Sequence, residues 1–435
     1  MRKFFVEVVI GEKKWLRLFG LFLLYSISCA GLFVSIFQSV FAATGNTGAE
    51  LYDTVPGNNS EINGKIASDT DSRHQYYYFR PEKTGAGAFY NPVSMIVEGG
   101  LGGLYNKKLT GVEWEAGARE LWRQLSNPVD AISQYGTKAF FYNEFIPHIG
   151  KGRNFAPNYW WHLIGGGFRT KLIEEYYHYN QYSRPRMLAW LTIYSMHFLN
   201  ELVQAEHFYQ IAQEGDLKLD ENRSIDALPD LLFFDWLGGV LFNLDPINKL
   251  ASGTFHLRDW TYQSQLNPVT GRLINNGQLF WARLPISGPF GLSVLTGEQI
   301  STFNISIDVA HDNQLSFGAG VKAKTFHFDS TGNIDAEALS FNFGIYWSKD
   351  DNPLVIATYE MANKEAIAQN PRVVNEYTEK TIINIYPGLF EFYGFRPGIT
   401  LSYQKEAYFA GISISGWPAG LIFSTPQKEK YLNAF

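Results

Sequence analysis

The chain has 435 residues, of which 46% are hydrophobic and 18% charged, and its formal net charge is −6 at neutral pH. A negative chain without basic patches is not expected to bind nucleic acid. Aromatic residues make up 16%, which is typical either of a large aromatic core or of a protein at a boundary between water and lipid.

Residues 1–42 predict a signal peptide. Five basic side chains come first, an almost uninterrupted apolar stretch follows, and Val40-Phe41-Ala42 ends it, which is the order of an export signal. A retained membrane anchor is the alternative, because the apolar stretch is long enough to span a bilayer. Cleavage would leave a net charge of about −9. It would also remove Cys29, the one cysteine, and with it disulfides, thiolate catalysis and cysteine–zinc sites.

The next two segments differ in composition. Residues 43–72 are rich in Gly, Asn, Ser and Asp and predict a flexible leader. Residues 73–110 mix aromatics with glycines, which favours N-terminal strands there.

Residues 111–265 predict a helical module. Asn127 as N-cap, Pro128 at the first helical position and Gly136 as a stop define a short helix. Longer helices are expected from Asn158 to Asn180, from Ser183 to Gly215 and from Ser224 to Phe242. Their apolar runs of about 12 to 14 residues are below the roughly 20 that cross a bilayer, so we expect buried helices.

The hydrophobic period changes from 3.6 to 2 after about Gly271. Apolar residues alternate with small or polar ones in Phe303–Val309, Leu315–Ala323 and Leu339–Trp347, and similar runs continue toward residue 425. This pattern predicts about 8–12 antiparallel strands over residues 271–425, and therefore an α+β fold. Pro426 and the charged residues after it predict a tail over residues 426–435.

Two architectures would suit such strands. In an outer-membrane-type β-barrel the apolar side meets lipid and the polar side meets the lumen, whereas in a soluble sandwich the apolar sides meet each other. The export signal, the aromatic content and the small, polar second face favour the barrel, with the helical module before it.

Candidate chemistry lies in the helical module. His162, His197, Glu201 and Asp230 stand on otherwise apolar helices, so burial would make them pair with one another. We therefore expect an interior polar cluster of candidate catalytic residues, with Arg169 as its counter-charge. Further candidate binding residues are Glu175, His178, Asp226 and Asp235.

Structural explanations compete with these assignments. Glu175 and His178 form a single Glu-x-x-His, whereas a di-iron bundle needs two such pairs and two more glutamates. His197 and Glu201 are one helical turn apart and could simply contact each other. Asp226 falls in a first helical turn, which favours negative charge without any function. We expect no metal and no cofactor.

The motifs of residues 158–242 resemble those of a known group of proteins. A His before a glycine-rich helix turn, then Asn-Glu, then Ser-x-Asp-x3-Asp before Leu-Gly-Gly resembles a group of uncharacterised bacterial envelope proteins. These join a helical hydrophobic module to outer-membrane β-strands. The resemblance carries over to His162, Glu201, Asp226 and Asp230, and it implies no established reaction.

These observations predict an exported outer-membrane β-barrel protein of a Gram-negative cell envelope, which contacts the lipid bilayer and binds a lipid or small ligand. One alternative is a lipid-modifying enzyme, a hydrolase or acyltransferase acting on lipid A or phospholipid, with His162 or His197 as base. Another is a soluble periplasmic binding protein. The sequence has no nucleophile elbow, phosphate loop, dinucleotide fingerprint or zinc-protease motif.

Overall fold

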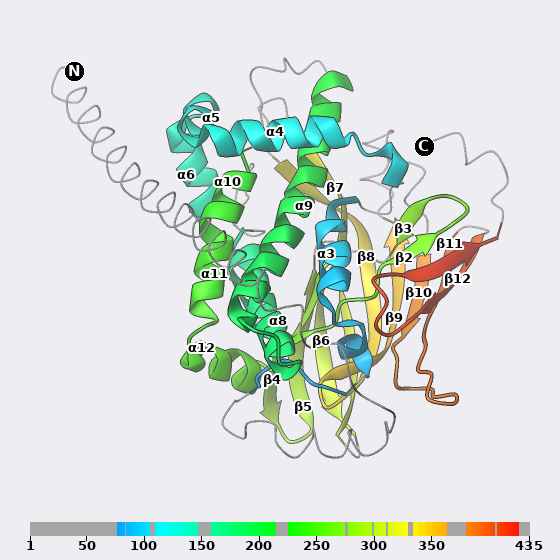
Figure 1. Cartoon of the computed structure of the whole chain (residues 1–435). Coiled ribbons are helices and arrows are strands. Elements are labelled where there is room, and N and C mark those ends of the chain that lie inside the picture. The colour runs from blue at the N-terminus through cyan, green and yellow to red at the C-terminus, as the bar shows by residue number, and fades with distance from the viewer. Residues whose placement is uncertain are drawn as a thin grey trace, which may run out of the picture. The chain divides into compact units, whose positions relative to one another are not determined.

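The computed structural model describes residues 76–82, 84–104, 109–146, 158–214, 225–274, 277–297, 300–309, 312–328, 334–362, 380–404 and 407–425. All of these residues belong to one compact unit, Gln75–Phe435. The predicted signal peptide (1–42), leader (43–72) and tail (426–435) lie outside the described residues. The described fold is α+β, as the sequence predicts, with the helices first along the chain and the strands after them (Figure 1).

The helices differ in type along the chain. The α-helices are α3 (Pro92–Gly100), α4 (Trp114–Ser126), α5 (Pro128–Tyr135), α6 (Thr137–Phe145), α8 (Gly167–Tyr179), α9 (Pro185–Glu214), α10 (Ala227–Pro229), α11 (Asp235–Leu241) and α12 (Asp245–Lys249). Short 3₁₀-helices are η1 (Gly85–Phe89), η2 (Gly102–Leu104) and η3 (Leu109–Gly111). The segments η4 (Asn158–Gly166), η5 (Asp230–Phe234) and η6 (Leu250–Thr254) are π-helices. This form is rare and occurs frequently at functional sites.

Local sequence signals place the helix ends. Pro128 takes the first position of α5, and Gly136 ends the helix with a φ of 97°. A glycine adopts such a backbone conformation without steric cost, which is why the predicted stop is correct. The long helix predicted to open at Ser183-Arg184-Pro185 is α9, which begins at Pro185.

The predicted strands within residues 73–110 are wrong. The described part of this range contains η1, α3, η2 and the start of η3, and no strand. The side chain of Asn91 accepts a hydrogen bond of 2.9 Å from the backbone N–H of Ser94, and Pro92 occupies the first helical position. This N-cap and this proline outweigh the glycines and aromatic residues that favoured strands.

One sheet contains all the strands of the described residues. They are β1 (Arg258–Asp259), β2 (Gln265–Asn267), β3 (Arg272–Ile274), β4 (Leu279–Ser287), β5 (Phe290–Gly297), β6 (Ile300–Asp308), β7 (Asn313–Phe328), β8 (Ile334–Lys349), β9 (Asn352–Ala362), β10 (Lys380–Ile385), β11 (Gly398–Gln404), β12 (Ala407–Ser413) and β13 (Gly420–Ser424). The sheet therefore begins before residue 271, inside the range predicted as helical.

The strand order is β1-β4-β5-β6-β7-β8-β9-β10-β11-β12-β13-β2-β3. Every neighbouring pair is antiparallel except β13 and β2, which run parallel. Within the described residues, hydrogen bonds do not close the sheet into the expected barrel, because β1 and β3 remain its two edges. The segment 260–264 joins β1, one edge strand, to β2, which lies next to the other edge strand, β3.

A band of apolar side chains, here called the apolar belt, crosses the sheet on one face. Its members are consecutive register partners from β4 to β13: Leu284, Leu292, Ile305, Phe317, Ile345, Ala357, Ile383, Leu401, Ala410 and Phe423. Each of them is exposed or half-buried. On β6 the exposure alternates, since Ile305 is 58% exposed while Asn304 and Ser306 are buried. The apolar face of the sheet therefore points away from the interior.

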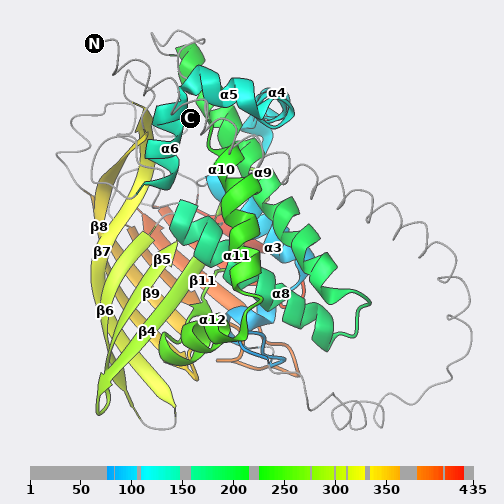
Figure 2. The ribbon, with the colours of Figure 1, turned by 90° about the vertical axis from the view of Figure 1, so that its left-hand side faces the viewer.

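The opposite face of the sheet is polar, buried and covered by helices. Figure 2 shows the helices on one side of the curved strands. On this face Ala88 and Phe89 of η1 belong to a buried cluster with Leu295 of β5 and Ile356 of β9. At the β4 end of the sheet, on the side of the belt, Trp160 of η4 donates a hydrogen bond of 3.2 Å to Thr296 of β5 and Phe168 of α8 packs edge-on against Phe280 of β4. Buried residues of the strands on the polar face include Ser293, Thr302, Asn304, Ser306, Ser316, Asn342, Thr358 and Thr400.

Apolar packing is concentrated where the helices meet the first strands. Trp260 and Trp281 are buried and stack with their ring centroids 3.9 Å apart. Tyr78, Phe168 and Phe242 form a neighbouring cluster with Phe280. Buried aromatic pairs of this kind contribute beyond their buried area, so they hold the helical module against the sheet.

In the part of the chain that the structure describes, no single helix has the length and apolar character to cross a bilayer. One bent pair, Ala227–Leu241 with Asp245–Thr254, meets the criterion by length and composition, with 80° between its halves.

Candidate functional site

Five buried residues of the helical module lie together: His162 in η4, His197 and Glu201 in α9, Asp230 at the start of η5 and Asp235 at the start of α11. We call them the polar cluster. Four of them are the residues for which the sequence predicts an interior cluster. The fifth is Asp235, which is one of the predicted binding residues.

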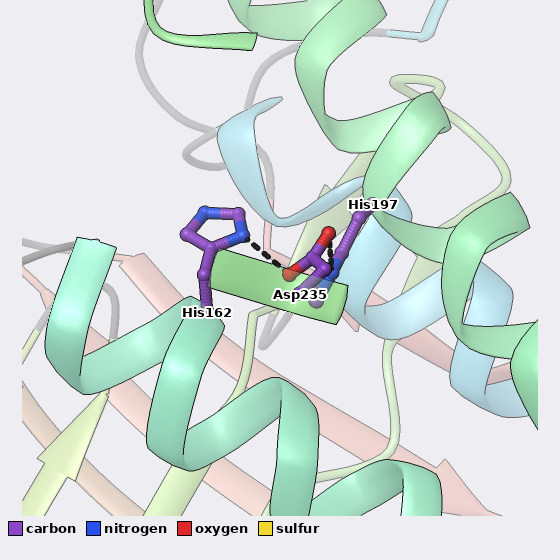
Figure 3. Close-up of side chains that lie close together, drawn as sticks. All are labelled: His162, His197 and Asp235. Atoms are coloured by element: carbon purple, nitrogen blue, oxygen red, sulfur yellow. Dashed lines mark hydrogen bonds and ion pairs between the residues drawn. The ribbon is translucent and has the colours of Figure 1, made fainter. Parts of the chain in front are cut away.

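Asp235 lies between the two imidazoles (Figure 3). Its Oδ1 is 3.0 Å from Nδ1 of His162, and its Oδ2 is 2.7 Å from Nδ1 of His197. On the other side of its ring, His162 places Nε2 at 3.3 Å from Oδ2 of Asp230. One carboxylate thus orients both rings, and a second carboxylate faces the free edge of His162.

Close backbone contact between helices makes this arrangement possible. A Cβ added to Gly167 would lie 2.5 Å from the carbonyl oxygen of Gly238, and one added to Gly238 would lie 2.4 Å from that of Leu163. At Gly166 an added Cβ would lie 2.9 Å from Cε1 of His197 and 3.2 Å from Oδ1 of Asp235. The glycines of Trp-His-Leu-Ile-Gly-Gly-Gly and Leu-Gly-Gly therefore bring His162 and Asp235 within hydrogen-bonding distance.

We expect Gly238→Ala to lower the free energy of unfolding by about 1–3 kcal/mol, because the added methyl group meets backbone that cannot rotate away. Gly253→Ala is the matched control. An added Cβ there meets no atom within 4 Å, so this change should be neutral or stabilising by up to about 1 kcal/mol. Urea unfolding of the two variants beside the parent measures both effects. Equal stability of the two variants would contradict the close backbone contact at Gly238.

Burial and neighbouring charges set the protonation of the cluster. Burial lowers the pKa of His162, but the carboxylates of Asp230 and Asp235 more than offset it and raise that pKa to about 10. For His197 burial dominates, and its pKa is lowered despite Asp235. Burial raises the pKa of Asp235, yet the imidazoles of His197 and His162 outweigh it and the net shift is downward. Burial, together with Glu201, raises the pKa of Asp230 well above its usual range.

These shifts describe a proton-holding network. Nδ1 of His197 lies 2.7 Å from Oδ2 of Asp235, and with the proton on Nδ1 its Nε2 accepts from the amide of Gln278 at 3.4 Å. A protonated His162 donates to Asp235 and forms an ion pair with Asp230. A proton can therefore pass between an imidazole and a carboxyl group of the cluster. Such transfer is what general acid–base chemistry requires.

The same donor atoms could hold a cation. Two overlapping groups each bring three ligand atoms within 4.8 Å of one another: His162, His197 and Asp235, and His162, Glu201 and Asp230. The described residues include no thiolate, so these sites would offer nitrogen and oxygen ligands only.

Arg169 does not act as the counter-charge predicted for the polar cluster. It is buried in α8 and pairs with Glu98 of α3 and with Asp259 of β1, the latter at 3.0 Å. It also donates a hydrogen bond of 3.0 Å to Thr261. The guanidinium therefore joins two helices to the edge of the sheet, and its charge is neutralised by carboxylates outside the cluster.

Glu175 and His178 lie apart from the cluster. The carboxylate of Glu175 accepts hydrogen bonds of 2.9–3.0 Å from the backbone N–H groups of Tyr77, Tyr78 and Phe79. His178 shares a hydrogen bond of 3.0 Å with the hydroxyl of Tyr76. Their role in this structure is to hold residues 76–79 on α8. Asp226 is half-buried just before α10, one turn from Asp230.

Glu98 and Asp259 are not among the site residues predicted from the sequence. Glu98 lies in the apolar run Pro-Val-Ser-Met-Ile-Val-Glu, which is the same signal that identified Asp230, a lone carboxylate among apolar residues. Asp259 follows Arg258 directly and has no such signal, because adjacent opposite charges are typical of exposed chain.

Comparison of the chain with family models, with curated proteins and with solved structures gave no match. The resemblance of residues 158–242 to envelope proteins therefore stays a prediction.

Proposed function

We propose that this chain is an outer-membrane protein of the cell envelope, with its sheet as the wall of a β-barrel that faces lipid and its helical module on the inner side. The apolar belt is the observation that carries this proposal. Exposed apolar residues on a soluble protein are scattered, whereas the belt is continuous in register from β4 to β13. Alternation of apolar-out and polar-in along each strand is the pattern of outer-membrane barrels.

Side chains of both edge strands contact the helical module, which is compatible with a sheet in a bilayer. Open sheet edges are not tolerated in hydrocarbon unless protein covers them. Asp259 of β1 is ion-paired with Arg169 of α8. Leu273 of β3 packs with Leu104 and Val203 of the helical module. In this proposal the helical module completes the wall beside the two edge strands.

The inner face supports binding of a lipid head group or another small polar ligand. Buried polar groups are normally hydrogen-bonded. Among the described residues, Oδ1 of Asn304, Oε1 of Gln314 and both amide atoms of Asn342 have no protein partner. Water or a polar ligand would satisfy them, as in the polar interior of barrels.

Expression of the full chain in a Gram-negative host tests the proposal. We expect the protein to sediment with outer membranes and to migrate faster on a gel before heating than after, because a folded outer-membrane sheet of this size stays compact in detergent until it is heated. Release into a periplasmic extract, with one migration position at both temperatures, would contradict it and support a soluble binding protein.

A further inference from the structure

We propose that the polar cluster is a site for one divalent first-row transition cation, held by Nε2 of His162 and by the carboxylates of Asp230 and Glu201. Asp235 and His197 orient these ligands without binding the ion. This inference does not depend on the membrane location proposed above, since it rests on the helical module alone.

The distances between side-chain atoms distinguish the proposed metal ligands from the residues that orient them. Metal–ligand bonds of about 2.0–2.1 Å in tetrahedral geometry place neighbouring ligand atoms about 3.3–3.4 Å apart. Nε2 of His162 and Oδ2 of Asp230 are 3.3 Å apart, which fits such an edge. The contacts of Asp235 with His162 and His197, at 3.0 and 2.7 Å, are hydrogen-bond lengths. The group of His162, Glu201 and Asp230 therefore fits an ion better than the group with His197.

Asp235 supplies the support that a metal-binding histidine needs. Such a histidine almost always donates its second ring N–H to a carboxylate or carbonyl, which fixes the tautomer and the ring orientation. Nδ1 of His162 is hydrogen-bonded to Asp235, so a cation that displaces the proton from Nε2 meets a lone pair that points toward Asp230. His197 binds the second oxygen of Asp235 and holds that carboxylate in place.

A second observation at Asp230 points to a ligand. The residue is only 4% exposed, and its Oδ1 has no hydrogen-bond partner among the described residues. Buried carboxylates are otherwise paired or coordinate metals. The carboxylates of Asp230 and Glu201 together would balance the charge of a divalent cation.

The donor set indicates the class of ion. One imidazole and two carboxylates suit zinc, manganese or iron in the divalent state. Three protein ligands leave a coordination position open, as catalytic zinc sites do and structural sites do not. His162 and Asp230 both lie in π-helical segments, which recur at functional sites.

Metal analysis of the purified full chain in detergent tests the site. The protein is first stripped with a chelator, then incubated with Zn²⁺ or Mn²⁺ and passed through gel filtration. Elemental mass spectrometry should then find about one ion per chain. The melting temperature should rise with the concentration of the ion and fall again with chelator. Less than about a tenth of an ion per chain, without such a rise, would overturn the proposal whatever the variants do.

Variants then test the assignment of ligands. Glu201→Gln and Asp230→Asn should abolish binding, whereas His197→Gln should keep one ion with affinity about 10–100-fold weaker. His178→Gln, a histidine change elsewhere in the module, is the control and should bind like the parent. Binding that survives Glu201→Gln but not His197→Gln would overturn the assignment. Circular dichroism shows which variants fold. If a ligand variant does not fold, the metal content of the parent protein alone decides whether the site exists.

Discussion

Ile305→Arg is expected to destabilise the protein in a bilayer by about 2–4 kcal/mol, which is the cost of a charged side chain on the lipid face of a barrel near the midplane. Ile305 is 58% exposed, and its register partners Leu292 and Phe317 belong to the same apolar belt. In water the same exposed position would accept arginine with a change within about 0.5 kcal/mol. The predicted loss therefore reports the surroundings of the belt.

Val129→Arg is the matched control for this measurement. Val129 lies on α5 and is 47% exposed, so its replacement should change the stability by no more than about 0.5 kcal/mol. Urea unfolding of both variants in lipid vesicles gives the comparison. If Ile305→Arg is as mild as Val129→Arg, the belt does not face hydrocarbon.

Arg169→Met is expected to cost about 3–5 kcal/mol, because it leaves the buried carboxylates of Glu98 and Asp259 without their cation. Arg186→Met is the control. Arg186 pairs with Glu174 at 3.3 Å but its side chain is 63% exposed, and exposed ion pairs contribute about 0–1 kcal/mol. Urea unfolding should show a much larger loss of stability for Arg169→Met than for Arg186→Met.

A combined variant identifies the cause of that loss. Arg169→Met together with Glu98→Gln and Asp259→Asn removes all three charges, so most of the lost stability should return. If the combined variant is as unstable as Arg169→Met, the packing of the long side chain, rather than its charge, is what matters.

The strands could be predicted well from the sequence because alternation is local. The run Phe-Gly-Leu-Ser-Val-Leu-Thr-Gly matches β5, Phe290–Gly297, and every other residue of such a run faces the same side whatever the strand pairs with. Whether the sheet closes into a barrel could not be predicted from this alternation. It depends on which strands become neighbours, and the pairing of β13 with β2 joins segments far apart in the sequence.

The polar cluster could also be predicted in part. Burial forces polar groups on apolar helices to find partners, and that reasoning identified His162, His197, Glu201 and Asp230. It could not assign Arg169, whose partners Glu98 and Asp259 come from distant parts of the chain. It also gave no sign of the π-helical turns that carry His162 and Asp230.

The parallel contact between β13 and β2 has a consequence for biogenesis. Gln265 and Gly420 are register partners, so the hairpin of β2 and β3 must wait, after synthesis, until almost the whole sheet has been made. Pairings between such distant segments slow folding and leave unpaired strand edges open to aggregation. The chain should therefore depend on a holding chaperone between its synthesis and the docking of its last strand.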